Sequence, residues 1–532
     1  MKYTLIGLII YAALFLIIWI LRPTSGLHAI QVLRPDDLFR PTKKNRIIIA
    51  AVCLATVLVA ILPMGISPFW NGSKESNQTH QYEEMAESLL HGHLYLELEA
   101  SDELLALDNP YDPYLRADIA GLERNVDYHW DHAFYKGRYY MYFGVVPVIL
   151  LFLPFRLITG TALTTYHATQ IFTAFYIVGV FSLLLLLIKR FYRKISLLLY
   201  LLMSMAISFM STWYIIMAPA LYCTAISSGL CMEIWSLYFF IKAVYDAPSE
   251  NKEILFAFFG SLFGALCFGC RPPIALANII VIPLLVVYIK DRGINVKRLL
   301  KLILAALPYI VIGVLLMWYN YARFDNPLEF GQAYQLTEAD QTQYVNMLSR
   351  IKLSKIWEAF IRLYCNLPNA EINTTGMYFA FPLTVLALLT PLFKGTRTKL
   401  KGDRLIGIVG GIFVSIFAML AFITAGSPRI NVRYVMDVAW ITGLVSFILL
   451  ASWLTSMSDN ESSGTGSGSI AVPAKAGLTK TGIANFLVCL LCLEAIIMSF
   501  VLFWYPYDYN ISTYIWGVIK DAVIHIFTLG LC

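Results

Sequence analysis

The sequence predicts an all-α polytopic membrane protein with about 12 to 13 transmembrane segments and large polar loops. Two features of composition lead to this prediction: 58% of the 532 residues are hydrophobic and 14% are charged, and the mean hydropathy is +0.67. Soluble proteins carry about 25% charged residues. The third observation is a recurrence of apolar stretches of about 18 to 25 residues, the length that crosses a bilayer as a helix.

Thirteen such stretches follow one another along the chain. We expect them at residues 4–21, 46–64, 140–158, 167–188, 196–216, 220–244, 254–270, 273–289, 299–318, 376–393, 405–425, 434–456 and 482–504. The first is too long for the apolar core of a cleaved signal peptide and no small-residue cleavage site follows it, so we expect it to be retained.

Four short segments between these stretches are rich in lysine and arginine. Residues 22–46, 189–194, 290–301 and 394–404 together hold 20 of the 40 basic residues. The positive-inside rule places all four in the cytoplasm. The net charge of +6 therefore follows membrane topology and does not imply a nucleic-acid partner. The long loops 65–138 and 319–375 are then expected on the outer face of the cell membrane.

One stretch does not fit this alternation. An odd number of crossings must join loop 65–138 to the basic segment 189–194, yet two apolar stretches lie between them. Pro147 and Pro154 interrupt the stretch 140–158, and proline removes helix hydrogen bonds. We therefore expect this stretch to be broken or re-entrant, with its backbone satisfied by surrounding protein.

These expectations divide the chain into seven parts. They are two N-terminal spans with a basic cytoplasmic loop (1–64), a first outer loop expected to be catalytic (65–138), a membrane core (139–318), a second outer loop (319–375), more membrane core (376–456), a flexible cytoplasmic linker rich in Ser and Gly (457–480), and a last span with a C-terminal tail (481–532).

The first outer loop concentrates polar chemistry. It holds 14 of the 34 acidic residues and five of the eight histidines, and loops fixed on a rigid scaffold commonly carry function. Each outer loop also contains a stretch with helical spacing of apolar residues, which predicts surface helices. In the first outer loop the apolar face consists of Tyr82, Met85, Ala86, Leu89 and Leu90, and Gly92 ends the helix. In the second outer loop it consists of Ile356, Ala359, Phe360, Leu363 and Tyr364.

The densest group of reactive side chains lies at the end of the first outer loop. Asp131 stands among histidines and is followed by an aromatic stretch that includes Tyr139 and Tyr140. Such a composition suits a sugar ring stacked on aromatics while a carboxylate handles its hydroxyls. An interfacial aromatic belt with solvated charges would use the same residues. Asp112, in a proline-framed turn with Arg116, is a second candidate acid, or only a turn with an internal salt bridge.

Histidines of the same loop leave a divalent metal possible. His91, His93, His129 and His132, with Asp127 and Asp131, are suitable ligand types. No metal-binding motif joins them, and histidines in such loops are more often exposed or hydrogen-bonded than metal-bound. No cofactor is therefore assigned.

Arginines at the outer ends of spans are candidate anion ligands. Arg271 lies between two apolar stretches, where a charge is costly and by default functional. The anion that membranes supply is a lipid phosphate, which guanidinium matches well. Arg429 and Arg433 precede the span 434–456, and an internal pair of Arg433 with Asp437 is the alternative reading. Arg323 opens the second outer loop in a segment suited to carbohydrate contact or to a simple helix exit.

Several of these segments, in this order, resemble the GT-C glycosyltransferases, specifically bacterial relatives of the dolichyl-phosphate-mannose protein mannosyltransferases. The matching segments are residues 82–96, 109–113, 130–147, 269–272, 320–331 and 433–437. The resemblance implies a GT-C-like fold and transfer of a hexosyl or pentosyl group from a polyprenyl-phosphate donor to a glycan, lipid or protein acceptor at the outer face. It implies that Arg271 and Arg433 bind the donor phosphate and that a loop carboxylate is the base. Membrane lipids are further expected partners.

The chain departs from the family pattern at one point. The family's catalytic acid usually stands shortly before an aromatic like Tyr82, and residues 76–80 contain no Asp. Glu75, Glu83, Asp112 and Asp131 are alternatives, as is an inactive protein, and we expect Asp131 first and Asp112 second. Competing functions are a transporter or flippase, or a polymerase or ligase of lipid-linked glycans, or a scaffold. A transporter would place its charges at the membrane midplane, and here they lie at the outer face.

Overall fold

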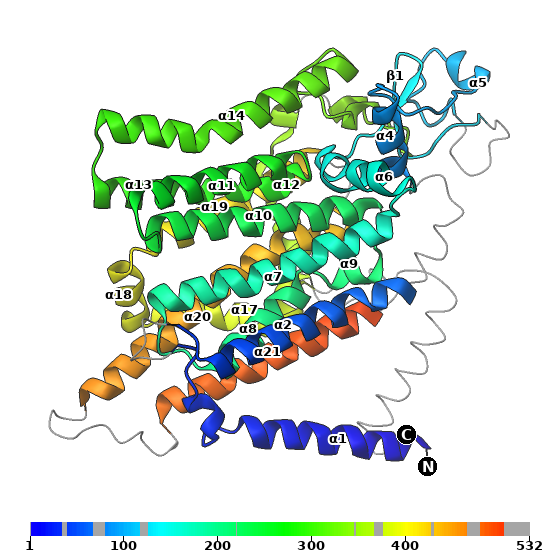
Figure 1. Ribbon diagram of the computed structural model, residues 1–532. Helices are drawn as coiled ribbons and strands as arrows, with labels where there is room; N and C mark the ends of the chain where they lie inside the picture. Colours follow the sequence, from blue (N-terminus) through cyan, green and yellow to red (C-terminus); the bar gives the residue numbers. More distant parts are fainter. Residues whose placement is uncertain are drawn as a thin grey trace.

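The computed structural model describes residues 2–33, 40–66, 80–116, 126–219, 221–344, 347–366, 376–426, 430–464 and 479–504. It confirms the predicted all-α membrane fold. Long helices run roughly side by side, and a small layer containing α4, α5 and a β-hairpin covers one end of them (Figure 1). Among the described residues, nine helices are long and apolar enough to cross a membrane. Shorter apolar helices account for the other predicted stretches.

The helices occur where apolar runs are bounded by caps or by proline and glycine. The α-helices are α1 Lys2–Leu21, α2 Lys43–Ile61, α4 Gln81–Leu90, α5 Asp102–Leu105, α6 Leu153–Thr159, α7 Thr165–Phe191, α8 Leu197–Met210, α9 Trp213–Met217, α10 Leu221–Tyr245, α11 Glu250–Phe268, α12 Pro272–Ala275, α13 Val281–Arg292, α14 Val296–Phe324, α15 Leu353–Phe360, α16 Met377–Ala380, α17 Pro382–Leu389, α18 Lys394–Gly402, α19 Ile406–Gly426, α20 Val435–Gly464 and α21 Lys480–Trp504. The strands are β1 Ala133–Tyr135 and β2 Arg138–Tyr140.

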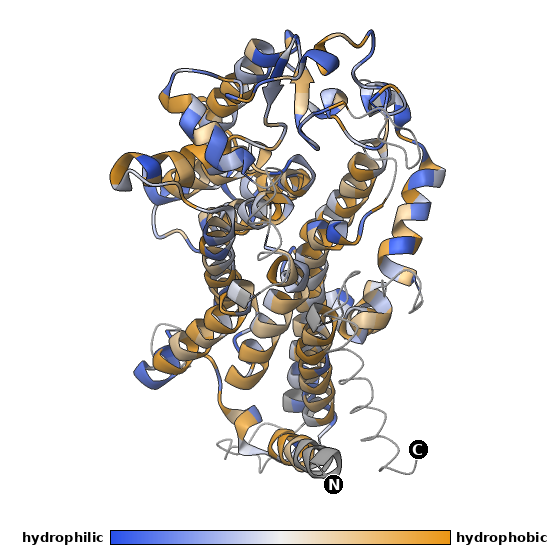
Figure 2. Cartoon of the chain, turned by 90° about the vertical axis from the view of Figure 1, so that its right-hand side faces the viewer, coloured by the Kyte–Doolittle hydropathy of each residue, from blue (hydrophilic) through white to orange (hydrophobic). Residues whose placement is uncertain are grey.

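Helix packing gives the bundle a buried centre and an open edge. Helix α20 is the central element: all of its most apolar 18-residue window is buried inside the protein. Helix α14, by contrast, has 11% of its window buried and lies along one edge of the bundle (Figure 1). A helix that is apolar on its exposed side suits a lipid environment rather than water. The hydrophobic colouring of the long helices in Figure 2 agrees with this.

The two ends of the bundle carry different elements. Basic helix α18 and the turn between α13 and α14 lie at one end, and the layer with α4, α5 and β1 lies at the other (Figure 1). Helix α20 continues to Gly464, into the segment 457–480 that we expected to be a linker. Most of the remaining linker lies outside the described residues.

Residues 140–158 do not run from one end of the bundle to the other. After β2 the chain forms a single π-helical turn, Val148–Phe152, and then α6. Arg156 of α6 binds Glu87 of α4, with 2.8 Å between Arg156 Nε and Glu87 Oε2. Glu83 of α4 accepts a hydrogen bond from the backbone N–H of Thr165, where α7 begins. The C-terminal end of this short segment and the start of α7 therefore lie beside α4.

The predicted surface helices form, but they pack on protein. Tyr82, Met85 and Ala86 of α4 are buried, and the Tyr82 ring stacks on Phe152 with a centroid distance of 5.2 Å. Ile356 and Ala359 of α15 are likewise buried, whereas its Trp357 is exposed. The apolar face of α4 is thus covered by the re-entrant segment rather than laid on lipid.

The two outer loops are joined by short backbone pairing. Strands β1 and β2 form a hairpin whose two-residue turn, Lys136 and Gly137, has positive φ at both positions, the conformation that suits the twist of a hairpin. Ala133 of β1 also pairs with Gln335 of the second outer loop. This contact fixes the second loop against the first, directly beside Asp131.

Candidate functional site

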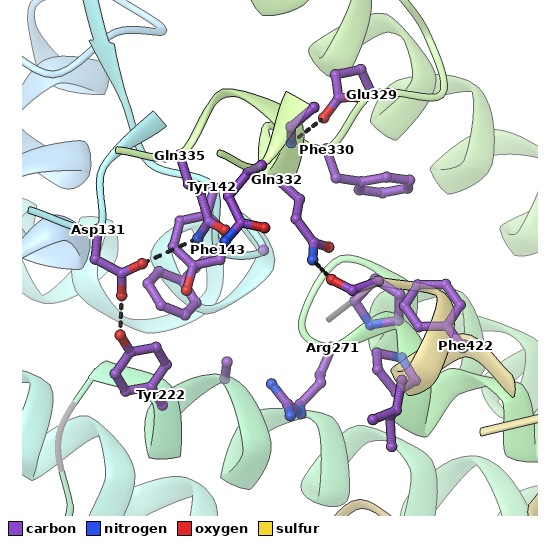
Figure 3. A pocket seen from close by; sticks show the side chains of 18 of the residues that line it. Asp131, Tyr142, Phe143, Tyr222, Arg271, Glu329, Phe330, Gln332, Gln335 and Phe422 are labelled. Carbon is purple, nitrogen blue, oxygen red and sulfur yellow. Dashed lines mark hydrogen bonds between the residues drawn. The ribbon is translucent and has the colours of Figure 1, made fainter. Parts of the chain in front are cut away.

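A cavity of about 820 Å³ lies between the joined outer loops and the ends of the long helices. Its lining comes from the first outer loop, the second outer loop, the ends of α10, α12, α14 and α19, and the turn before α20. Figure 3 shows Asp131 and Tyr222 on one side, Phe330 and Phe422 on the other, and Arg271 between them. The cavity thus brings together residues from 130 to 434 of the chain.

Asp131 is held in this cavity by its backbone and by both carboxylate oxygens. It has a φ of 60°, a conformation that Asp adopts more readily than most residues. Its N–H donates to Leu336 O at 2.9 Å, and its carbonyl accepts from Gln81 Nε2 at 2.9 Å. Oδ1 accepts from Gln335 Nε2 at 3.2 Å, and Oδ2 accepts from the Tyr222 hydroxyl. The carboxylate is therefore aimed into the cavity by two distant segments.

The environment of Asp131 makes its carboxylate a stronger base. Only 5% of Asp131 is exposed, and this burial raises the pKa of its carboxyl above the ordinary value, although the Tyr222 hydroxyl and the nearby Arg433 act in the opposite direction. Removal of water disfavours the charged form, while donors and cations favour it. A carboxylate in such surroundings binds a proton more readily than an exposed Asp, which is what a general base requires.

Arg433 lines the same cavity and binds aromatic faces instead of a carboxylate. Its guanidinium carbon lies 3.8 Å from the centroid of the Tyr222 ring and 5.7 Å from that of Tyr434. Within the part of the chain that the structure describes, no ion pair or hydrogen bond of the Arg433 side chain is present. A guanidinium with unused donors at a cavity wall is a site for an anion with oxygen acceptors.

Arg271 also lines the cavity, but it has a carboxylate partner. Its Nε and Nη2 donate to the two oxygens of Asp437 at 2.6 and 2.8 Å, and Asp437 is fully buried. The alternative prediction that Asp437 pairs with Arg433 is wrong. Arg433 lies in the 3₁₀ turn Val432–Tyr434, before α20 begins at Val435, so the two residues are not one regular helical turn apart. Among the residues that the structure describes, hydrogen bonds of the Arg271 guanidinium use Nε and Nη2 and leave Nη1 for a ligand.

The other predicted substrate-binding residues lie in less favourable places. Arg323 lines the cavity, but it donates to Met141 O at 2.6 Å and to Asn320 Oδ1 at 2.9 Å, so it ties the second outer loop to the end of β2. Tyr139 and Tyr140 are buried in the packing of the hairpin and are not among the cavity-lining residues. Arg429 lies outside the described residues.

The alternative acids are placed away from the cavity. Asp112 Oδ1 accepts from Tyr114 N–H at 2.8 Å in an exposed turn, and Asp112 is not a lining residue. Arg116 donates instead to the carbonyls of Pro110 and Thr337. Glu83 caps α7 through Thr165. Glu75 lies outside the described residues. The structure therefore brings together Asp131, Arg271, Arg323 and Arg433, and leaves Asp112 at the surface.

The histidines of the first outer loop are engaged with carboxylates and rings. His91 Nδ1 and His93 Nδ1 each lie 2.9 Å from Glu97 Oε1, and His129 packs edge-on against Tyr139. Among the described residues, no three His, Cys, Asp or Glu side chains are grouped as metal ligands. This geometry therefore does not support a divalent metal site formed by these histidines.

Sequence reasoning missed several residues that shape the cavity. Tyr222 and Gln335 hold the Asp131 carboxylate. Glu329 is buried and accepts the N–H of Gly331 at 2.7 Å, in a turn where Gly331 has a φ of 93°. Tyr222 lies in an apolar stretch, which gives no local signal. Glu329 and Gln335 lie in the segment that we expected to suit carbohydrate contact, but no pattern within it distinguishes them from their neighbours. Only the approach of residues 320–336 to Asp131 in three dimensions shows that Glu329 and Gln335 line the cavity.

Comparisons with known proteins place this geometry in a wider context. No family model matches the chain, and no curated protein matches it in sequence. Among solved structures, the apo form of the oligosaccharyltransferase of Archaeoglobus fulgidus is a distant neighbour, with a TM-score of 0.44 and 11% sequence identity. The similarity covers 87% of this chain and 56% of that one, so the chain spans little more than half of the neighbour's length. Nothing about function follows from a likeness at this level.

Proposed function

We propose that the chain is a membrane glycosyltransferase that moves a sugar from a polyprenyl-phosphate donor to a hydroxyl acceptor at the outer face of the cell membrane. The observation that carries this proposal is the presence of Asp131 and Arg433 in one cavity at the ends of the spans, where a lipid phosphate and a water-soluble group can meet. The remaining donors of Arg271 and the aromatic lining support it. Without such a cavity, the residues that carry the sequence resemblance would not form a common site.

The chemistry assigns a different task to each side chain. Asp131 takes the proton of the acceptor hydroxyl as its oxygen forms a bond to the anomeric carbon of the donor sugar. The bond between that carbon and the phosphate oxygen breaks, and its electron pair stays on the departing lipid phosphate. Arg433 stabilises the negative charge that develops there. A direct displacement of this kind inverts the anomeric configuration.

Apolar side chains at the membrane level fit the lipid part of such a donor. Leu316 and Tyr319 of α14 and Phe422 and Ile423 of α19 line the cavity. The polar lining from the second outer loop, such as Gln332 and Gln335, suits a carbohydrate or another hydroxyl-bearing acceptor. The identity of the sugar is left to experiment.

The experiment is to incubate the purified protein with a panel of hexosyl and pentosyl polyprenyl phosphates and to measure release or transfer of the sugar. We expect one donor to be consumed by the wild type. Replacing Arg433 by Ala should weaken binding of that donor about 10- to 100-fold, because a hydrogen bond to a charged group is worth about 1.5 to 3 kcal/mol. Arg433→Lys should recover part of the loss, since it restores the charge without the fork of donors.

Arg138→Ala is the matched control. Arg138 is an exposed arginine of β2 in the same outer layer, and it stacks on Tyr95 away from the cavity. Its removal should leave donor binding unchanged. Consumption of no donor by the wild type, or an equal loss in both variants, would contradict the proposed function.

A further inference from the structure

Tyr222 occupies a position between the candidate base and the candidate phosphate ligand. It is the second residue of α10, and its hydroxyl donates to Asp131 Oδ2. The face of the same ring lies 3.8 Å from the guanidinium carbon of Arg433. Phe143 packs edge-on against the ring at a centroid distance of 5.5 Å and keeps it in this orientation. One side chain thus contacts both charged groups through different parts of its ring.

We propose that Tyr222 is a positioning residue that couples occupation of the phosphate site at Arg433 to the basicity of Asp131. The inference rests on the proposed function for the identity of the base and of the phosphate. It adds a residue, and a direction of influence, that the reaction itself does not require. No other described side chain bonds the Asp131 carboxylate and also stacks on the Arg433 guanidinium.

The physical basis is the polarity of the phenol. A cation above the ring face draws electron density from the ring, and this makes the hydroxyl a stronger hydrogen-bond donor. A stronger donor favours the ionised form of Asp131. When the donor phosphate binds Arg433 and neutralises its charge, the Tyr222 hydroxyl becomes a weaker donor. Asp131 then holds a proton more tightly, so the base gains strength at the moment when the donor is in place.

Other groups that face Asp131 set the background for this effect. They are Arg433 before α20, Tyr142 after β2, the adjacent His132, and the neutral Gln335 of the second outer loop. The Tyr222 hydroxyl is also near Tyr434. None of these needs to change when Tyr222 is altered. A substitution at residue 222 therefore isolates the contribution of the phenol hydroxyl from that of the ring.

The test measures the protonation of Asp131 directly, so that it does not depend on transfer. Infrared difference spectra, recorded as a function of pH, follow the carboxylic acid band that is lost in Asp131→Asn. In Tyr222→Phe the midpoint of the Asp131 titration should move about one pH unit upward, the size expected for loss of one hydrogen bond to a carboxylate. Undecaprenyl phosphate should move the midpoint upward in the wild type and less in Tyr222→Phe.

Two further variants give the measurement a matched set. Incorporation of 3-fluorotyrosine at position 222 keeps the shape but makes the phenol more acidic, so the midpoint should move to lower pH. It also tests the inference if Tyr222→Phe fails to fold. Tyr176→Phe removes a buried hydroxyl that bonds Ser211. Neither residue lines the cavity, so this variant should change nothing. The coupling would be overturned if the titration midpoint of Asp131 were unchanged in both position-222 variants. It would also be overturned if Tyr222→Phe shifted this midpoint equally in proteins with and without Arg433.

Failure of the coupling through Tyr222 is distinguishable from failure of the proposed function. If the coupling is correct and the chain also transfers sugar, the acid limb of the pH–rate profile should move with the infrared midpoint. Activity requires ionised Asp131 and is lost as the pH falls through its pKa, so the limb moves to higher pH in Tyr222→Phe. A purely structural role for Tyr222 would lower the rate equally at every pH, and that result contradicts the inference while leaving the function intact.

Discussion

Two arginines line one cavity, and each is associated with a different acid: Arg433 with Asp131, which also lines the cavity, and Arg271 with Asp437, which is buried behind it. Asp437 and Arg271 form a two-fold hydrogen-bonded ion pair, whereas Asp131 and Arg433 are separated by the Tyr222 ring, which contacts both. A pair that satisfies itself holds α12 and α20 together. A combination that leaves its charges directed at the cavity is free to act on a ligand. We therefore propose that the second combination, Asp131 with Arg433, is the reactive one.

The largest expected effect is on turnover when the reactive acid is neutralised. Asp131→Asn keeps the size of the side chain and suits the positive φ. It should lower turnover about 100- to 10,000-fold, the usual contribution of a general base, without weakening donor binding. The measurement is single-turnover transfer with the preferred donor of the panel.

The control for this variant is Asp325→Asn. Asp325 also has positive φ, and it forms a surface pair with Lys136. Turnover should be unaffected. Loss of turnover in both variants, or in neither, would remove Asp131 from the role of base.

The next largest effect is expected on stability, and it concerns the ion pair of Arg271 with Asp437. Asp437→Ala leaves the Arg271 guanidinium, whose side chain is 12% exposed, without its partner; breaking a buried pair typically costs about 3 to 5 kcal/mol. We expect a clear fall in the unfolding midpoint of the protein in detergent. Arg433→Ala should leave this midpoint nearly unchanged, because no described carboxylate forms an ion pair with this arginine and would be left without its partner. The reverse order of the two midpoints would contradict the distinction between the pairs.

The sequence anticipated the parts of this arrangement that depend on local patterns. Apolar runs predict spans because each run must satisfy its own environment in lipid. Arg271 and Arg433 were recognised because a charge at the end of a span is unusual. The partner of Asp437 was not predictable, because spacing along the chain favoured Arg433, while the turn before Val435 and the approach of α12 select Arg271.

Asp131 illustrates the same limit at the cavity. Its surroundings depend on Gln335 and Leu336, about 200 residues away in the chain, and on the first turn of α10. In the sequence it differs little from Asp112, which also lies among aromatics and turn residues. Only the pairing of the two outer loops buries one acid and leaves the other in an exposed turn. Tyr139 and Tyr140 were chosen for their aromatic character, yet strand alternation and packing direct them elsewhere.

The smallest effect should come from the acid that sequence reasoning ranked second. Asp112→Ala removes one hydrogen bond to Tyr114 N–H in an exposed turn. Surface changes of this kind usually alter stability by about 0.5 kcal/mol or less, and turnover should stay within about twofold of the wild type. A loss of turnover comparable to that of Asp131→Asn, in the same single-turnover assay, would reverse the ranking of the two acids.

The most direct test of the reactive combination is an experimental structure of the protein bound to undecaprenyl phosphate. We predict that phosphate oxygens lie within hydrogen-bond distance of the Arg433 guanidinium, that Arg271 keeps both bonds to Asp437, and that the Asp131 carboxylate faces the phosphate-bearing end of the cavity. A phosphate bound away from Arg433, or an Arg271 that leaves Asp437 to take the phosphate alone, would contradict the account.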